Sequence, residues 1–162
     1  MKIELATLEN LENILNIYEE SRLFMKDHNN YSQWKDNYPP KETIIDDINK
    51  KVLYIVTNNN EIVGVFALIE GEDETYKNIY DGAWLNSLPY VTLHRLGTKT
   101  NVKGVGQFVI DYIVSNYKNI RADTHINNIP MNNLLLKNNF IKCGTIFVKD
   151  GSSRIAYQKS RE

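Results

Sequence analysis

The spacing of apolar residues predicts four helices along the 162-residue chain. In four segments, apolar side chains recur every three or four positions, as they do on the buried face of an amphipathic helix. These segments are residues 8–25, 41–51, 104–117 and 128–139. In the last of them Asn128 is the expected N-cap and Pro130 lies in the first turn, where its missing N–H costs nothing.

Seven further segments have the alternation, or the β-branched and aromatic content, that predicts strands. They are residues 2–7, 52–57, 62–71, 90–98, 120–125, 140–148 and 154–160. Polar turns join the second strand to the third and the sixth to the seventh, which predicts two hairpins. Residues 72–89 are too irregular to assign. The order of elements predicts an α/β fold with antiparallel and crossover connections, in one domain spanning residues 1–162.

Composition and charge narrow the possible functions. The formal net charge is −1, which argues against a nucleic-acid-binding protein, since such domains are usually basic. Neither a signal-peptide pattern at the N-terminus nor an 18-residue apolar run is present, so we expect no membrane partner. A single cysteine, Cys143, fits a reducing compartment, and the expected location is the cytoplasm. The three histidines lack metal-ligand spacing, so we expect no metal.

A glycine-containing loop before the third predicted helix has the properties of an anion site. Gly104 and Gly106 allow backbone N–H groups to approach a ligand closely, and Lys99 and Lys103 add positive charge nearby. A helix N-terminus favours phosphate for the same electrostatic reason. The loop matches neither the dinucleotide-binding nor the P-loop pattern, because a third glycine and the Gly-Lys-Ser/Thr sequence are both missing. Taken alone, the two glycines are equally compatible with a tight strand-to-helix turn.

Three consecutive runs resemble the GNAT superfamily of N-acetyltransferases. The runs are HRLGTKTNVKGVGQFVIDYI, IRADTHINNIPMNNLLLKNNF and IKCGTIFVKDGSSRIAYQK. The family loop has Arg or Gln, two residues, Gly, one residue, and Gly or Ala, and Asn101–Gly106 occupies that pattern. The following family helix has an Asn, a small or apolar residue three positions later, and a final Gly-Phe, matched here by Asn128, Met131 and Asn139-Phe140.

The resemblance implies a fold and a ligand. The implied fold is a single mixed, mostly antiparallel sheet of about seven strands flanked by about four helices, and the implied phosphate ligand is acetyl-coenzyme A. The residues in these runs are similar to those of a bacterial branch of the family whose substrate is uncertain. The cofactor-binding residues that the resemblance implies are Leu96, Gly97, Thr98, Asn101, Val102, Lys103, Gly104, Val105, Gly106, Gln107, Asn128 and Lys137.

Two departures from the family pattern affect the expected chemistry. The first loop position is Asn101 instead of Arg or Gln, which we expect to matter little because backbone groups make most phosphate contacts. Many family members have a tyrosine, five residues before the final phenylalanine, that protonates the leaving thiolate; Leu135 stands there. Release of a thiolate at pH 7 costs only about 2 kcal/mol, whereas deprotonating an alkylamine costs about 4.6 kcal/mol. A base is therefore needed more than an acid.

The candidate base lies in the predicted strand at residues 90–98. Side chains alternate along a strand, so Tyr90, Thr92 and His94 share one face, which the resemblance places toward the substrate. His94 is the natural base near pH 7, with Tyr90 as a second candidate that positions substrate or a water chain. The backbone N–H near Leu96 is the candidate donor to the thioester oxygen. Asp123 is a candidate for orienting a histidine.

Aromatic loops are the candidates for substrate binding. Trp34 and Tyr38 lie in one irregular stretch and Trp84 in another, and such rings either stack on a cationic amine or simply fill the core. The leading hypothesis is acetyl transfer from acetyl-coenzyme A to the primary amine of a small molecule. Two alternatives stay open: a protein or peptide N-acetyltransferase, and a non-catalytic acyl-coenzyme A binding protein supported by Leu135. A homodimer through a terminal hairpin is possible.

Overall fold

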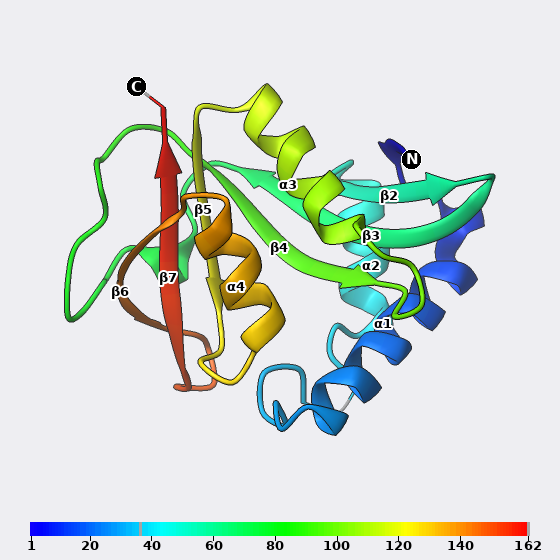
Figure 1. Ribbon diagram of the computed structural model, residues 1–162, viewed down its shortest axis with the longest axis horizontal. Helices are drawn as coiled ribbons and strands as arrows, with labels where there is room; N and C mark the ends of the chain where they lie inside the picture. The colour runs from blue at the N-terminus through cyan, green and yellow to red at the C-terminus, as the bar shows by residue number, and fades with distance from the viewer. Residues whose placement is uncertain (36, 162) are drawn as a thin grey trace.

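A computed structural model describes residues 1–35 and 37–161 of the chain. Seven strands form one sheet in the order β1-β2-β3-β4-β5-β7-β6 (Figure 1). The strands are β1 (Lys2–Leu5), β2 (Leu53–Asn58), β3 (Glu61–Glu70), β4 (Val91–Thr98), β5 (Asn119–Thr124), β6 (Ile141–Phe147) and β7 (Ser153–Ser160). All neighbouring pairs are antiparallel except β4 and β5, which are parallel. The predicted mixed, mostly antiparallel sheet is thus confirmed.

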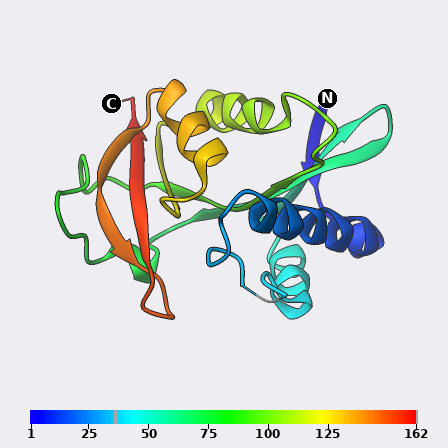
Figure 2. The ribbon, with the colours of Figure 1, turned by 60° about the horizontal axis from the view of Figure 1, so that its bottom comes forward.

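Four α-helices cover the two faces of the sheet. They are α1 (Leu11–Asp27), α2 (Lys41–Asn49), α3 (Val105–Asn116) and α4 (Ile129–Lys137), with 3-10 turns at η1 (Leu8–Asn10) and η2 (Glu74–Tyr76). Figure 2 shows α3 and α4 on one side of the sheet and α1 and α2 on the other. Each side has its own apolar cluster, one built on α3, α4 and the central strands and one on α1, α2 and β2–β3.

Helix boundaries follow from local chemistry. The side chain of Asn128 accepts a hydrogen bond from the N–H of Met131 at 3.2 Å, so it caps α4 as predicted. Pro130 lies in the first turn of the same helix. Gly104 is the N-cap of α3 with φ of +82°, a conformation that glycine adopts without strain. The predicted helix over residues 8–25 is divided, because its first three residues form η1 and α1 begins only at Leu11.

The parallel strands β4 and β5 pair only at their beginnings and then separate. Their register joins Val91, Thr92 and Leu93 of β4 to residues 120–122 of β5, and no pair beyond Leu93 is formed within the described chain. Figure 1 shows the two strands diverging past this point. A bulge at the same place shifts the register of β4 against β3, and Arg95 has φ of +53°. A bulge bends its strand and redirects side chains, so β4 presents an unpaired edge toward the opening.

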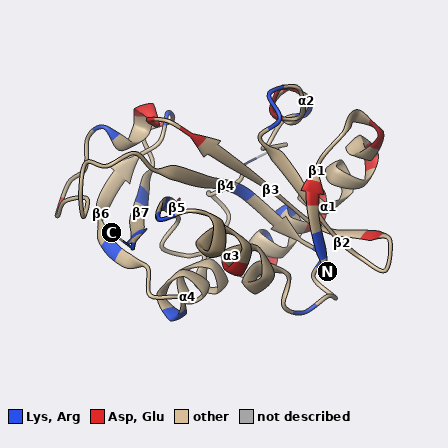
Figure 3. Ribbon diagram, turned by 90° about the horizontal axis from the view of Figure 1, so that it is seen from above, with Lys and Arg blue, Asp and Glu red and all other residues tan. Residues whose placement is uncertain are grey.

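Charged residues of both signs are interspersed over the molecule (Figure 3), in keeping with the net charge of −1. Among residues 1–35 and 37–161, no helix has the length and apolar content needed to cross a bilayer.

Candidate active site

The opening between β4 and β5 is a cavity of about 560 Å³. We call it the splay cavity. Its floor comes from Leu93–Leu96 of β4, from Asp123 and Thr124 of β5, and from the start of α4 at Asn128 and Met131. Its walls come from the connection between α1 and α2, from η2, and from the turn between β6 and β7. A cavity at the point where strands separate is bounded by backbone whose hydrogen bonds are not used by the sheet.

His94 lies in this cavity and is held by a carboxylate. Its Nε2 is 2.7 Å from Oδ2 of Asp73, and both side chains are about one-fifth exposed. The other carboxylate oxygen of Asp73 accepts from the N–H and the hydroxyl of Thr75, at 2.9 and 2.7 Å. Burial raises the pKa of Asp73, but the hydrogen bonds from His94 and Thr75 outweigh it and lower the pKa to about 2. Asp73 is therefore ionised and fixes the orientation of the imidazole.

Sequence reasoning considered Asp73 only as one of several acidic residues that could attract an amine, and did not find it as the partner of His94. It selected Asp123 as the carboxylate that could orient a histidine, but Oδ2 of Asp123 accepts a 2.6 Å hydrogen bond from the hydroxyl of Tyr76 instead. Tyr90 also meets Asp73, since its hydroxyl accepts from the backbone N–H of Asp73 at 2.8 Å. Tyr90 and His94 thus both contact Asp73, the N-cap residue of η2, in a segment whose sequence was too irregular to assign.

A strap formed by residues 28–35 crosses the mouth of the splay cavity. Gln33 donates to Thr124 Oγ1 at 3.2 Å and accepts from the side-chain amide of Asn128 at 3.0 Å. Ser32 Oγ is 3.1 Å from Nε2 of His125. These contacts join the α1–α2 connection to β5 and α4, on the far side of the opening. The strap therefore covers part of the cavity, which remains open to solvent elsewhere.

The bulge residue Arg95 anchors the opposite wall. Its guanidinium Nε and Nη2 lie 2.9 and 2.8 Å from Oδ2 of Asp47 in α2. Both side chains are largely buried, at 13% and 7% exposure. The hydroxyl of Tyr18 donates to the carbonyl oxygen of Arg95 at 2.8 Å. These bonds hold the unusual backbone conformation at Arg95 and thus the unpaired edge of β4.

The glycine loop lies between β4 and α3, as the sequence predicted. Gly104 has open space where a side chain would be, whereas a Cβ on Gly106 would lie 3.1 Å from Leu134 of α4. Val102 and Val105 pack into the core on the α3–α4 side, so only their backbone faces outward. The N–H groups of residues 103–107 donate to no acceptor in the described chain, as is usual in the first turn of a helix. The loop has the backbone donors that a phosphate requires.

Several predicted cofactor side chains are engaged within the protein. Lys99 Nζ contacts Oε1 of Glu61 at 2.6 Å, and the carboxamide of Gln107 bonds to Asp111 and to Asn138. The contact between Gln107 and Asn138 brings the exposed Lys137, at the end of α4, close to the start of α3. Gly97 and Thr98 pair with Val65 and Gly64 of β3, while Asn101 and Lys103 are exposed.

The structure also shows where the three aromatic candidates for substrate binding lie, and what surrounds Leu135, which stands where many family members have a tyrosine. Trp34 and Tyr38 line the splay cavity, and Trp34 also packs edge-on against Tyr18 in the core. Trp84 lies outside the cavity lining: its ring and that of Tyr90 each lie 4.0 Å from the guanidinium of Arg121. Leu135 is fully buried in the α3–α4 core, so its position offers no group to the cavity.

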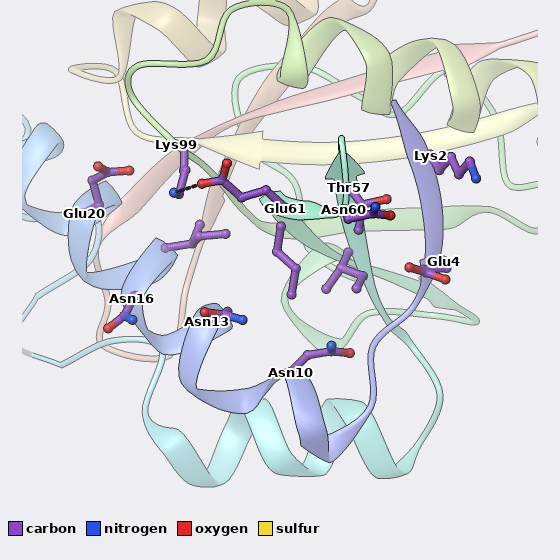
Figure 4. Close-up of a pocket in the computed structure, with 13 residues that line it drawn as sticks. Lys2, Glu4, Asn10, Asn13, Asn16, Glu20, Thr57, Asn60, Glu61 and Lys99 are labelled. Atoms are coloured by element: carbon purple, nitrogen blue, oxygen red, sulfur yellow. Dashed lines mark hydrogen bonds and ion pairs between the residues drawn. The ribbon is translucent and has the colours of Figure 1, made fainter.

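A second hollow, of about 770 Å³, is larger than the splay cavity but does not belong to it. It lies between α1 and the strands β1–β3, and Figure 4 shows its lining of asparagines and charged side chains. Lys99 and Glu61 form an ion pair at one edge of it. Among the residues that the structure describes, the histidine–carboxylate pair beside an unpaired strand edge lines the splay cavity and not this second hollow.

The fold and the splay cavity define an α/β protein with one mixed sheet and a ligand-sized opening between its two parallel strands. Comparison with solved structures identifies the family. No protein-family model and no curated sequence matches the chain. A GNAT-family acetyltransferase from Streptococcus agalactiae is 31% identical, with 99% of this chain and 95% of that chain covered and a TM-score of 0.91. A Staphylococcus aureus protein assigned to the acetyltransferases is 28% identical, with 99% of each chain covered and a TM-score of 0.70.

The chain therefore belongs to the GNAT family of acetyltransferases. A more distant structure, yncA from Salmonella typhimurium with its cofactor acetyl-CoA, is 13% identical over 99% of this chain and 94% of that chain, with a TM-score of 0.67. At that identity the likeness concerns the fold alone.

Proposed function

We propose that the protein transfers the acetyl group of acetyl-coenzyme A to the primary amine of a small molecule. The observation that carries the proposal is the pairing of His94 with Asp73 at the unpaired edge of β4, inside the splay cavity. The strap favours a small acceptor over a polypeptide, because the bonds of Ser32 and Gln33 to His125 and Thr124 narrow the opening of the cavity.

The part of the site that would bind the acetyl donor has groups that suit the phosphates and the thioester arm of acetyl-coenzyme A. The backbone N–H groups of residues 103–107 would hold the pyrophosphate, and Lys103 and Lys137 would add charge. The unpaired backbone of Leu96 and the carboxamide of Asn128 would hold the pantetheine arm beside β4. When bound, acetyl-coenzyme A supplies the activated acetyl group. Leu96 N–H would stabilise negative charge on the acyl oxygen.

His94 would accept the proton of the acceptor ammonium. Its Nε2 is committed to Asp73, so Nδ1 is the nitrogen left to act as the base, and no described residue hydrogen-bonds to it. Fixing one tautomer matters because a neutral imidazole accepts a proton at only one nitrogen. An alkylamine at pH 7 needs about 4.6 kcal/mol to lose its proton, and a positioned base lowers that requirement where the reaction occurs.

The experiment combines binding and turnover. Acetyl-coenzyme A is titrated calorimetrically into wild type, His94→Ala and His28→Ala, and free-thiol release is then followed with a panel of diamines, amino alcohols, amino acids and aromatic amines. His28 is the control, because its Nδ1 bonds the carbonyl oxygen of Phe24 and the residue is not among those that line the splay cavity. We expect unchanged binding in all three proteins and a loss of kcat of about 10²-fold or more in His94→Ala alone.

Other results would contradict the proposal in different ways. Tight binding without turnover of any amine would favour a non-catalytic acyl-coenzyme A binder. Turnover of peptide N-termini in preference to every small amine would favour a peptide N-acetyltransferase. An unchanged kcat in His94→Ala would remove His94 from the role of base.

A further inference from the structure

Arg154 is a buried cation in the wall of the splay cavity. It lies at the start of β7, and only 7% of its surface is exposed. Its Nη1 donates to Ser152 Oγ at 3.0 Å and to the carbonyl oxygen of Ser153 at 2.9 Å. Its Nη2 donates to the carbonyl oxygen of Gln33 at 3.3 Å. All three acceptors are uncharged, and no carboxylate of the described chain lies within ion-pair distance.

Hydrogen-bonding capacity remains on this guanidinium. A guanidinium has five N–H donors, and the three bonds above leave Nε–H and one hydrogen of Nη2 without an acceptor in the described residues. Nε–H and Nη2–H form the edge of an arginine that binds a carboxylate through two parallel hydrogen bonds. A buried charge without a partner of opposite sign is costly, so an anion arriving from the cavity would be bound favourably.

Charges of both signs line the cavity, and two of the lining residues, Arg95 and Asp150, are paired with Asp47 and Lys35. Asp73 and Asp123 lie beside His94 on the side of η2 and β5, and Lys149 and Arg154 lie on the side of the β6–β7 turn. Lys35 of the strap also lies on this second side, where its ammonium is paired with Asp150 at 3.4 Å. The positive charge of Arg154 acts on neighbouring groups. Together with burial, which has the larger effect, it lowers the pKa of His125. One ligand that bears both an amine and an anion would match both ends.

We propose that the acceptor of this enzyme is an amine that also carries a carboxylate, and that Arg154 binds that carboxylate. The inference rests on the proposed function, because it concerns the second end of the same acceptor. It adds a specificity-determining residue on β7 and narrows the acceptor to amino acids and related amino carboxylates. His94 and Arg154 are carried by β4 and β7, which lie on either side of β5 in the sheet.

The test compares matched amines. A series of linear amines with one to six methylene groups is prepared in two forms, one ending in a carboxylate and one in the corresponding amide, and kcat and KM are measured for acetylation. We expect at least one carboxylate to exceed its own amide in kcat/KM by about 10- to 100-fold, the range typical of a hydrogen bond to a charged group. In Arg154→Gln the preference should vanish through a higher KM, and Arg154→Lys should retain part of it.

Two controls separate recognition from loss of structure. Ser152→Ala removes one neutral acceptor of Arg154 but keeps the charge, so it should preserve the carboxylate preference. A thermal unfolding transition and an acetyl-coenzyme A affinity close to those of wild type would show that Arg154→Gln is folded.

The outcomes distinguish the two proposals. Equal turnover of carboxylates and amides by wild type, or a preference that persists in Arg154→Gln, would overturn this inference and leave the proposed function standing. No turnover of any small amine, with acetyl-coenzyme A bound, would overturn both.

Discussion

Replacing Asp73 with asparagine tests both the stability of the site and its chemistry. The pKa of Asp73 lies at about 2, against an ordinary value of 3.8. This difference corresponds to about 2 kcal/mol of stabilisation of the folded, ionised state. Its side chain is only about one-fifth exposed, so solvent screening removes little of that energy. An asparagine oxygen can still accept from Thr75, which makes about 2 kcal/mol an upper value for the loss in Asp73→Asn.

The sign of the pH dependence follows from the direction of this pKa. Because the folded-state pKa is lower than the unfolded-state value, the stabilisation is fully present above about pH 4 and is lost as pH falls toward 2. At about pH 3 roughly half of it remains. Wild type and Asp73→Asn should therefore differ most at neutral pH and converge in acid.

The assay is urea unfolding of both proteins at pH 7, 5, 4 and 3, with a thermal scan at pH 7. We expect Asp73→Asn to be less stable by about 1–2 kcal/mol at pH 7, or lower in Tm by about 2–8 °C for a chain of this length. Equal stability at pH 7, or a difference that stays constant down to pH 3, would refute the assigned ionisation. The same variant should lower kcat and leave acetyl-coenzyme A affinity unchanged, because Asp73 acts through His94.

Three further predictions concern the framework of the site. Arg95→Met leaves Asp47 buried without its ion-pair partner and should cost about 3–5 kcal/mol in urea unfolding; an unchanged midpoint would contradict that assignment. Gly104→Ala and Gly71→Ala both place alanine at a positive φ with no steric contact, so the free energy of unfolding of each should fall by about 1–2 kcal/mol. Calorimetry should show weaker acetyl-coenzyme A binding only for Gly104→Ala. Leu135→Tyr overpacks a fully buried position and should destabilise by about 1–3 kcal/mol without raising kcat.

Local signals predicted much of the fold. The N-cap at Asn128, Pro130 in the first turn of α4 and the two hairpins depend on neighbouring residues, and all appear in the structure. The bulge at Arg95 could not be predicted, because its backbone conformation is unusual for arginine and depends on Asp47 and Tyr18, which are distant in sequence.

For the same reason, only part of the candidate site could be predicted from the sequence. His94 could be selected from its residue type and strand position, but its partner Asp73 precedes it by 21 residues and lies in a segment without regular spacing. Trp84 looked like a pocket residue, and only the tertiary structure shows that it packs on Arg121. The strap contacts of Gln33 span more than 90 residues of sequence, and polar residues in an irregular segment give no sign of such bonds.

The strap has a consequence for how this enzyme can diversify. Gln33 and its neighbours, η2 and the β6–β7 turn surround one end of the splay cavity, whereas the glycine loop belongs to the β4–α3 connection. Connecting segments generally tolerate insertions and substitutions better than strands and helices do, although Trp34 and Tyr76 anchor the first group in the core. New acceptor preferences can therefore arise by exchanging these peripheral segments, while the donor half is inherited unchanged. In an evolutionary sense the two halves of the site are separate modules on one sheet.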